Sequence, residues 1–323
     1  MTAIAITGAT GFLGGALARQ LLGTGQSVIA MGRNETKLAA LEQLGATCIA
    51  GDLSRGAPPA PGTDVSAVIH CAALSSAWGA YAGFRAANVY ATSSALAFAR
   101  ISGARRFVHI STPSLYFRLC DQRLVREDMA LPQPVNAYAA TKREAESLVQ
   151  TQTDLDYLIL RPRGLYGPGD TALLPRLLRA ARTGPLPLVR GGSAETDLTH
   201  IDDVVDSVLA ALRAPAALPK RVFNISGGEP KSIRTITEAA CARAGVAVRW
   251  RSMPSRVLLV AARAMEVASH MQSQRPEPRI TAYGAGLFAF TQTLDISAAK
   301  AHLGWSPAVS FEEGLRRTFE VPV

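Results

Sequence analysis

The chain has 323 residues, of which 48% are hydrophobic and 18% are charged. This balance excludes a disordered chain and suffices to fill the core of one large α/β domain, or of a domain with an added lobe. The net charge is +9 at pH 7. The basic residues are scattered rather than interleaved with aromatic residues on one element, which argues against a nucleic-acid partner.

The nearest approach to a basic cluster is Arg176, Arg179 and Arg182, at helical spacing after Pro175. A solvated helix face explains this spacing, and attraction of an anionic substrate or a membrane surface is the alternative. The cysteines are too far apart for a zinc site or a disulfide framework, so we expect a reducing compartment. They are Cys48, Cys71, Cys120 and Cys241.

A strand pattern begins within a few residues of the N-terminus, so we expect no targeting segment. The most apolar later stretch, Val257–Ala268, contains Arg263 and Glu266 and is too short to span a bilayer. We therefore predict a cytoplasmic protein without an integral membrane segment.

Strand-like and helix-like patterns alternate through the first half of the chain. Because helices separate most of the strands, the pattern predicts a parallel sheet covered on both faces. The expected strands are Ala3–Thr7, Ser27–Met31, Thr47–Ala50, Val65–Cys71, Phe107–Ile110 and Tyr157–Leu160. The expected helices are Gly11–Gly23, Lys37–Leu44, Ala80–Gly103 and Asn136–Gln150.

Glycine and proline break the pattern after Pro162. A helix at Asp202–Arg213 and a strand at Arg221–Ile225 are expected to return to the sheet, and the remaining helices to build a lobe interleaved with it. These remaining helices are Thr171–Arg182, Lys231–Ala244, Ser255–His270 and Phe311–Phe319. The predicted fold is therefore α/β, a Rossmann-type doubly wound parallel sheet with a smaller interleaved C-terminal lobe.

A glycine-rich turn, Gly8-Ala9-Thr10-Gly11-Phe12-Leu13-Gly14, joins the first strand to its helix. Its glycines permit a tight turn, close approach of a pyrophosphate, and close packing of helix on strand. The helix N-terminus then offers free N–H groups and a partial positive charge to the phosphates. The loop predicts a dinucleotide site; a merely tight turn is the alternative.

The segment after the second strand distinguishes NAD from NADP. NAD-preferring sites place an acid there for the ribose 2′-hydroxyl, whereas this chain has Met31-Gly32-Arg33-Asn34. Arg33 can bind a 2′-phosphate through a charge-assisted fork. We predict NADP(H) rather than NAD(H), the alternative being that Arg33 is an ordinary surface arginine. Asp52, after the third strand, is expected to meet the adenine amino group.

The fourth strand ends in His70-Cys71-Ala72-Ala73, whose small residues would let the backbone approach the cofactor closely. No second ligand accompanies His70, so we expect it to be packed in the core and predict no metal site.

Tyr138 and Lys142 lie four residues apart, on one face of a predicted helix. A tyrosine with its usual pKa of about 10 is a poor acid–base group, so we expect Lys142 and the nicotinamide ring to lower that pKa. Ser111 and Thr112 close the fifth strand at the carboxyl edge of the sheet, where ligands bind. A hydroxyl there can hydrogen-bond a reacting oxygen.

Motifs over nearly the whole chain resemble the extended short-chain dehydrogenase/reductases of the NAD-dependent epimerase/dehydratase superfamily. They are TGATGFLG at Thr7–Gly14, GDL at Gly51–Leu53, HCAA at His70–Ala73, the Asn88-Val89 pair, STPSLY at Ser111–Tyr116, YAATK at Tyr138–Lys142, RPRGLYGPGD at Arg161–Asp170 and HIDDV at His200–Val204.

This resemblance implies that Tyr138 is the general acid/base and that Lys142 holds the nicotinamide ribose. It also implies that Thr112 holds the reacting oxygen and that Asn88 positions the lysine. The implied cofactor-binding residues are Gly8, Thr10, Gly11, Phe12, Leu13, Gly14, Arg33, Asp52, Leu53, Ala72, Ala73, Tyr138, Lys142 and Pro162. Residues 1–163 and 199–227 are then the dinucleotide-binding domain, and 164–198 and 228–323 the substrate-binding lobe.

Members of this family divide into nucleotide-sugar enzymes and enzymes of less polar molecules. Three positions depart from the nucleotide-sugar pattern: Pro113-Ser114 replaces an acidic pair, Gly164 an asparagine, and Thr196-Asp197 an Arg-Asp pair. A nucleotide-sugar epimerase or dehydratase with tightly bound NAD remains the alternative. A non-enzymatic NADP(H) sensor is disfavoured, because it would need no acid–base residues.

The C-terminal region and the segment Ser111–Phe117 are similar to the 3β-hydroxysteroid dehydrogenase and 2-alkyl-3-oxoalkanoate reductase branch. We predict interconversion of a ketone and a secondary alcohol on a lipid-like or steroid-like substrate, bound by Ser114, Tyr116 and Arg163.

Several candidate substrate residues have a purely structural explanation as well. The apolar side chains of Leu258, Leu259 and Met265 would either line a substrate wall or pack in the core. Arg163 binds a substrate anion or pairs with Asp170, and Arg190 is equally ambiguous. The helices Ala80–Gly103 and Asn136–Gln150 match those that form a four-helix interface in the family, so we predict a homodimer.

Overall fold

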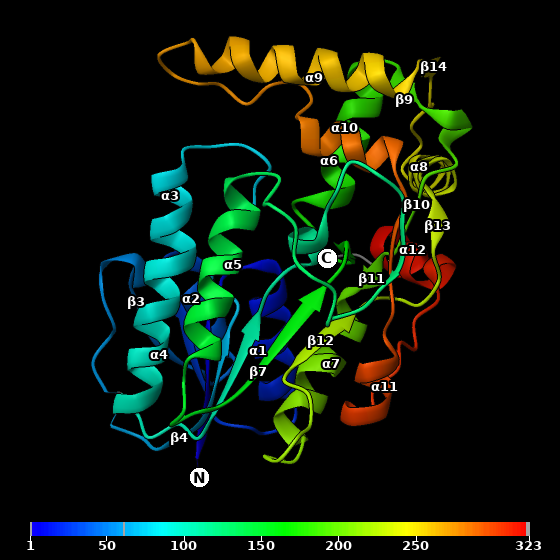
Figure 1. Cartoon of the computed structure of the whole chain (residues 1–323). Coiled ribbons are helices and arrows are strands. Elements are labelled where there is room, and N and C mark those ends of the chain that lie inside the picture. The colour runs from blue at the N-terminus through cyan, green and yellow to red at the C-terminus, as the bar shows by residue number, and fades with distance from the viewer. Residues whose placement is uncertain (1, 61, 321–323) are drawn as a thin grey trace.

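The computed structural model describes residues 2–60 and 62–320. Its centre is a seven-stranded sheet in the order β12-β7-β5-β4-β1-β2-β3, parallel throughout (Figure 1). The strands are β1 (Ala3–Thr7), β2 (Val28–Gly32), β3 (Thr47–Ala50), β4 (Val65–His70), β5 (Arg106–Ile110), β7 (Asp156–Pro162) and β12 (Val222–Ile225). The predicted doubly wound α/β fold is confirmed.

Apolar cores cover both faces of the sheet. Successive residues of a strand point to opposite faces, so each strand contributes to both cores. In β1, Ile4 and Ile6 face one apolar core, while Ala3 and Ala5 face the other. The first core is covered by α1 (Phe12–Gly23), α2 (Glu35–Gln43), α7 (Ile201–Arg213) and α11 (Ser297–Leu303), and the second by α4 (Ala91–Ile101) and α5 (Ala137–Gln150).

The strand order reverses beside β1, because the chain moves outward through β2 and β3 and then returns to β4 on the other side. In register, Thr7 lies beside Met31 and His70, and His70 lies beside His109. The carboxyl ends of these strands therefore reach the same edge of the sheet. Such a reversal point is where doubly wound folds bind ligands.

The single helix predicted over 80–103 is interrupted. It consists of α3 (Tyr81–Arg85), a π-helical turn at Ala86–Tyr90, and then α4. The wide turn carries Asn88, which is 1% exposed. Such turns inside helices frequently mark functional positions, and Asn88 is one of the predicted site residues.

Four larger helices and several short strands form the rest of the chain. The sequence prediction missed the short strands and two helices, α10 (Ala282–Ala289) and α11. The other helices are α6 (Leu173–Thr183), α8 (Ile233–Arg243), α9 (Ser255–His270) and α12 (Phe311–Glu320). The short strands are β6 (Gln122–Val125), β8 (Leu165–Tyr166), β9 (Leu186–Leu188), β10 (Glu195–Thr196), β11 (Thr199–His200), β13 (Lys231–Ser232), β14 (Trp250–Ser252) and β15 (Gln292–Leu294).

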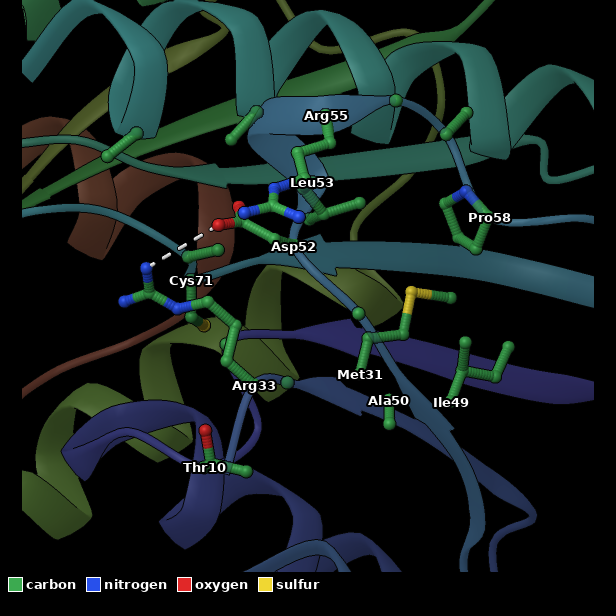
Figure 2. Close-up of a pocket in the computed structure, with 18 of the residues that line it drawn as sticks. Thr10, Met31, Arg33, Ile49, Ala50, Asp52, Leu53, Arg55, Pro58 and Cys71 are labelled. Carbon is green, nitrogen blue, oxygen red and sulfur yellow. Dashed lines mark ion pairs between the residues drawn. The ribbon is translucent and has the colours of Figure 1, made fainter. Parts of the chain in front are cut away.

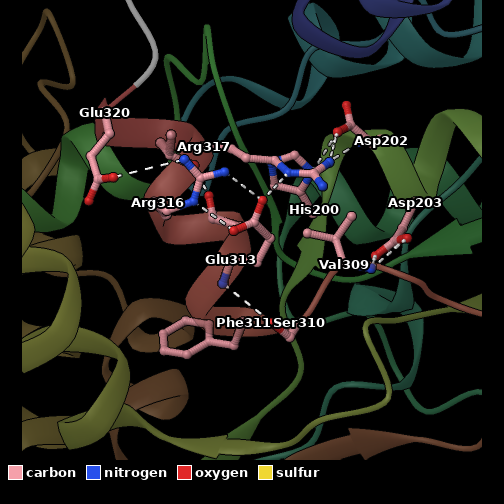
Figure 3. Close-up of polar contacts among 12 residues, drawn as sticks. His200, Asp202, Asp203, Val309, Ser310, Phe311, Glu313, Arg316, Arg317 and Glu320 are labelled. Atoms are coloured by element: carbon pink, nitrogen blue, oxygen red, sulfur yellow. Dashed lines mark hydrogen bonds and ion pairs between the residues drawn. The ribbon is translucent and has the colours of Figure 1, made fainter.

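The segment His200–Val204 binds the C-terminal part of the chain through hydrogen bonds and an ion pair (Figure 3). The buried carboxylate of Asp203 accepts hydrogen bonds from the backbone N–H groups of Ala308, at 2.7 Å, and Val309, at 3.3 Å. Arg317 on α12 pairs with Asp202 at 2.8 Å. These contacts give the motif a structural role.

Within residues 2–60 and 62–320, no helix combines the length and the apolarity needed to cross a bilayer.

Candidate active site

A cavity of about 550 Å³ opens at the carboxyl ends of β1, β2, β3 and β4 (Figure 2). Of the predicted cofactor residues, it is lined by Gly8, Thr10, Gly11, Arg33, Asp52, Leu53, Ala72 and Ala73. The remaining lining residues include Met31, Gly32, Ile49, Arg55, Pro58 and Cys71. The cavity therefore joins the glycine turn to the loops after β2, β3 and β4.

The glycine turn is too crowded for side chains. A Cβ atom on Gly14 would lie 2.2 Å from the carbonyl oxygen of Gly8, and one on Gly8 would lie 2.7 Å from the amide of Ala72. Gly8 also has a φ of 68°, which favours glycine. Gly11 is the N-cap residue of α1 and offers no side-chain cap. These residues fit a dinucleotide phosphate, which would approach bare backbone at a helix N-terminus.

Two arginines and an aspartate surround one end of the cavity (Figure 2). The guanidinium of Arg33 lies 3.8 Å from the carboxylate of Asp52, and its side chain is 75% exposed. Hydrogen bonds from Ser54 lower the pKa of Asp52, and the charges of Arg33 and Arg55 lower it further. The sequence analysis missed Arg55, which only its place shortly after the GDL segment could have indicated.

The predicted hydroxyl groups meet at the end of β5. The hydroxyl of Thr112 donates to that of Ser114 at 3.0 Å, and Ser114 lies 2.9 Å from the phenol oxygen of Tyr283 on α10. The phenol of Tyr138, on the first turn of α5, belongs to the same group. Burial raises its pKa, while hydrogen bonding with Thr112 and Ser75 opposes the rise. Ser75 and Tyr283 were not foreseen.

Lys142 is buried, and β5 holds its ammonium group. Its Nζ donates to the carbonyl of Ile110 at 2.6 Å and lies 3.3 Å from Nε2 of His109. Burial lowers the pKa of Lys142 to about 8. Because burial dominates at Tyr138 and raises its pKa, the expected lowering of that pKa by Lys142 is wrong for the protein alone.

Asn88 connects α5 to the loop after β4. Its Oδ1 accepts the backbone N–H of Leu74 at 2.7 Å, and its Nδ2 donates to the hydroxyl of Thr141 at 3.0 Å. Asn88 therefore joins the residue beside Lys142 to the loop that carries Ser75.

His70 is packed in the core, as expected. Its two ring nitrogens lie 2.7 Å from the hydroxyl of Thr7 and 2.9 Å from that of Thr92. Burial, followed by the charge of Lys142, lowers the pKa of His70 to about 3, so the ring is neutral.

Tyr116 corrects one prediction about the substrate residues. Its side chain is 1% exposed, and its hydroxyl donates to Asn224 at 2.9 Å. The guanidinium of Arg161 lies 4.9 Å from the ring centre and pairs with the buried carboxylate of Glu146. Tyr116 is therefore part of a buried polar network, and its hydroxyl is bonded within the protein rather than open to the predicted substrate contact.

Arg163 also differs from expectation. It is 6% exposed, and it donates to Thr196 at 3.0 Å and to Gln292 at 2.5 Å. Its predicted pairing with Asp170 is wrong, because that carboxylate accepts backbone N–H groups at the start of α6. Two of the guanidinium nitrogens of Arg163 are therefore engaged within the protein. Arg190 pairs instead with Asp121 at 2.8 Å.

The three apolar residues of α9 that were candidates for a substrate wall have different surroundings. Leu258 is 5% exposed and packs with Ala262, Ala285 and Ala289, so core packing explains it. Leu259 packs against the same cluster, whereas Met265 is half-buried outside it.

The fold and this edge of the sheet define a nicotinamide-dinucleotide enzyme, and the comparisons agree. A model of the NAD dependent epimerase/dehydratase family matches residues 4–226. The chain belongs to this family and is an NAD(P)-dependent oxidoreductase.

Similar proteins extend over nearly the whole chain. An uncharacterized protein, YbjS, from Escherichia coli is 35% identical, covering 98% of this chain and 96% of its own. A 2-alkyl-3-oxoalkanoate reductase from Stenotrophomonas maltophilia is 34% identical, covering 97% of each. Among solved structures, UDP-glucuronic acid 4-epimerase from Bacillus cereus in complex with NAD has a TM-score of 0.74 at 25% identity, covering 99% of this chain and 96% of its own.

Proposed function

We propose that the protein uses NADP(H) to interconvert a ketone and a secondary alcohol on a lipid-like substrate. The observation that carries the proposal is the hydrogen bond between Tyr138 and Thr112, with Lys142 one helical turn further along α5 and the glycine turn lining a cavity at the same edge of the sheet. Similarity to a 2-alkyl-3-oxoalkanoate reductase across 97% of both chains supports the choice of substrate class.

Reduction requires a proton donor at the carbonyl oxygen. The raised pKa of Tyr138 keeps its phenol protonated at neutral pH, which suits a general acid. The hydroxyl of Thr112 is placed to hold the same oxygen, and the bound nicotinamide supplies the hydride. Lys142 is the candidate for holding the nicotinamide ribose. Asn88 positions Lys142 through its hydrogen bond to the neighbouring Thr141.

Ser114 and Tyr283 are the candidates for the substrate end of the site, with the buried ring of Phe117 packed behind Tyr283. The Tyr283 and Phe117 rings meet edge to face, 4.9 Å apart, and Ser114 places a hydroxyl beside the Tyr283 phenol. An aromatic ring beside two hydroxyl groups suits a ketone on an apolar chain.

The two arginines at the cavity support NADP(H). A ribose 2′-phosphate between Arg33 and Arg55 would gain charge-assisted hydrogen bonds that a 2′-hydroxyl cannot accept to the same extent. We expect Arg33→Ala and Arg55→Ala each to raise the Kd for NADPH about tenfold or more, while leaving that for NADH within about twofold.

The matched control is Arg105→Ala, since Arg105 is an exposed arginine just before β5, at the opposite edge of the sheet. Fluorescence titration gives the Kd values. Equal losses for NADPH and NADH, or tighter NADH binding by the native protein, would contradict the preference.

The nucleotide-sugar epimerase alternative is favoured by the likeness to the UDP-glucuronic acid 4-epimerase structure. A thermal-shift titration with NADPH, NADH, UDP-glucose and a long-chain 3-keto acid separates the two functions. The proposal predicts stabilisation by NADPH that the keto acid increases and UDP-glucose does not. Stabilisation mainly by UDP-glucose, or NAD that stays bound through purification, would favour the epimerase.

A further inference from the structure

The outward face of α9 is an apolar stripe that no part of the chain over residues 2–60 and 62–320 covers. The exposed fractions are 56% for Val257, 68% for Val260, 60% for Val267 and 83% for Met271, which follows the helix. These positions recur every three or four residues, with exposed Ala264 completing the series, so they share one face of the helix. Figure 1 shows α9 along the top margin of the molecule.

The opposite face of α9 packs against the rest of the protein. Leu258, Ala262 and Ser269 are buried there, and Glu266, the helix's one acidic residue, accepts the backbone N–H of Ala282 at 2.7 Å. The inward face therefore already has its partner in α10, whereas the stripe is additional apolar surface.

Positive charge borders the stripe. Arg256 and Arg263 are exposed and seven residues apart, so they lie along one edge of it. Four more arginines occur in the adjoining segments, namely Arg249, Arg251, Arg275 and Arg279. Within residues 2–60 and 62–320, none of these six arginines pairs with a carboxylate, while the nearby Glu277 is already paired with Arg176.

We propose that this face of α9, the stripe of Val257, Val260, Ala264, Val267 and Met271 with its arginine border, rests on an anionic lipid bilayer. A helix that presents a narrow apolar face beside basic residues lies in the plane of the interface, with the apolar side chains among the headgroups. Each arginine near such a surface adds attraction to anionic lipids. A second copy of the chain fits less well, because paired α9 helices would bring these arginines together.

The location suits an enzyme of lipid-like molecules, and this part of the inference rests on the proposed function. Beyond the end of α9, the carbonyl of Arg275 accepts the indole N–H of Trp78 at 3.0 Å, and the Trp78 ring lies 4.5 Å from that of His270. The loop of Trp78 also carries Ser75, beside Tyr138. The bilayer-facing helix therefore adjoins the substrate side of the active site.

The test is flotation of the full chain with vesicles of phosphatidylcholine and phosphatidylglycerol in equal parts, against phosphatidylcholine alone. We expect the protein to float with the anionic vesicles, at least about tenfold more than with neutral ones, and to be released by high salt. Two variants, Val257→Ser/Val260→Ser/Val267→Ser and Arg256→Glu/Arg263→Glu, should each lower the bound fraction roughly tenfold.

The matched control is Arg105→Glu/Arg213→Glu, which changes net charge equally at two exposed arginines away from α9 and should still bind. Absence of vesicle binding by the native protein, or an equal loss in this control, would overturn the proposal. So would sedimentation showing that the valine variant separates two copies of the chain. Reduction of a short, water-soluble ketone should be unchanged in both α9 variants, so a failure of the proposed activity is recognised separately.

Discussion

Lys142 is an ammonium group placed against two neutral imidazoles. The rings of His70 and His109 stack with centres 5.4 Å apart, and burial lowers the pKa of both. The same burial lowers the pKa of Lys142 to about 8. The residue proposed to hold the cofactor ribose therefore loses its proton close to physiological pH.

This gives a prediction about cofactor binding. A lysine with a lowered pKa is charged below that value and neutral above it, so the Kd for NADPH should increase severalfold as the pH rises from about 7 to about 9. Fluorescence titration across this range measures the change. In Lys142→Met, binding should be weaker and nearly independent of pH; the same rise in that variant would assign the effect to another group.

The substrate residues show where sequence reasoning stops. Tyr138, Lys142 and the glycine turn were identifiable because their chemistry depends on local spacing. Tyr116 and Arg163 were misjudged because their partners, Asn224 and Gln292, are remote in sequence. A pattern gives the residue type at a position but not which distant group satisfies it.

At the scale of elements, the strands of the central sheet and the long helices followed from hydrophobic periodicity, whereas α10 did not. Its sequence, AYGAGLFA, contains two glycines, which are poor helix formers. A Cβ atom on Gly286 would lie 2.6 Å from the ring of Phe117, so close packing requires a glycine there. Tertiary contact thus stabilises the helix that brings Tyr283 to the site, and no local pattern announces it.

The α1 helix offers a test of the glycine turn with an internal control. In Gly14→Ala, the added Cβ would meet the Gly8 carbonyl at 2.2 Å, so we expect the free energy of unfolding to fall by about 1–3 kcal/mol. NADPH binding should weaken in the same variant. Denaturant unfolding and titration measure the two effects.

Gly23→Ala, at the other end of α1, is the control. Its Cβ would meet nothing within 4 Å, so its stability should stay equal or rise by up to about 1 kcal/mol. Similar behaviour of the two variants would mean that the turn is not held as tightly as the structure indicates.

At the scale of the whole molecule, the seven-stranded sheet positions the cofactor cavity, while α10 contributes Tyr283 and the loop after β4 contributes Ser75 to the hydroxyl cluster. The general arrangement was predictable from the alternation of strands and helices. The division into 1–163 with 199–227, and 164–198 with 228–323, stays a prediction.

The homodimer also stays a prediction, and it concerns the outer faces of α4 and α5. Tyr90 and Ile101 are 46% and 53% exposed beside α4, and Ala97 lies between them on the same face. We expect sedimentation to give twice the mass of one chain and Ala97→Glu to shift the protein toward the monomer. Ala40→Glu, on exposed α2, should not; a native monomer would exclude this interface.

The central claim is that Tyr138 protonates a ketone oxygen during NADPH-dependent reduction. The most direct measurement is the steady-state oxidation of NADPH with a 2-alkyl-3-oxoalkanoic acid, comparing the native protein with Tyr138→Phe and with Tyr157→Phe, a control at the amino end of β7, away from the site. The account predicts turnover by the native protein and the control, and a loss of about 10²–10⁴-fold in kcat for Tyr138→Phe with an unchanged Kd for NADPH. Full turnover by Tyr138→Phe would contradict it.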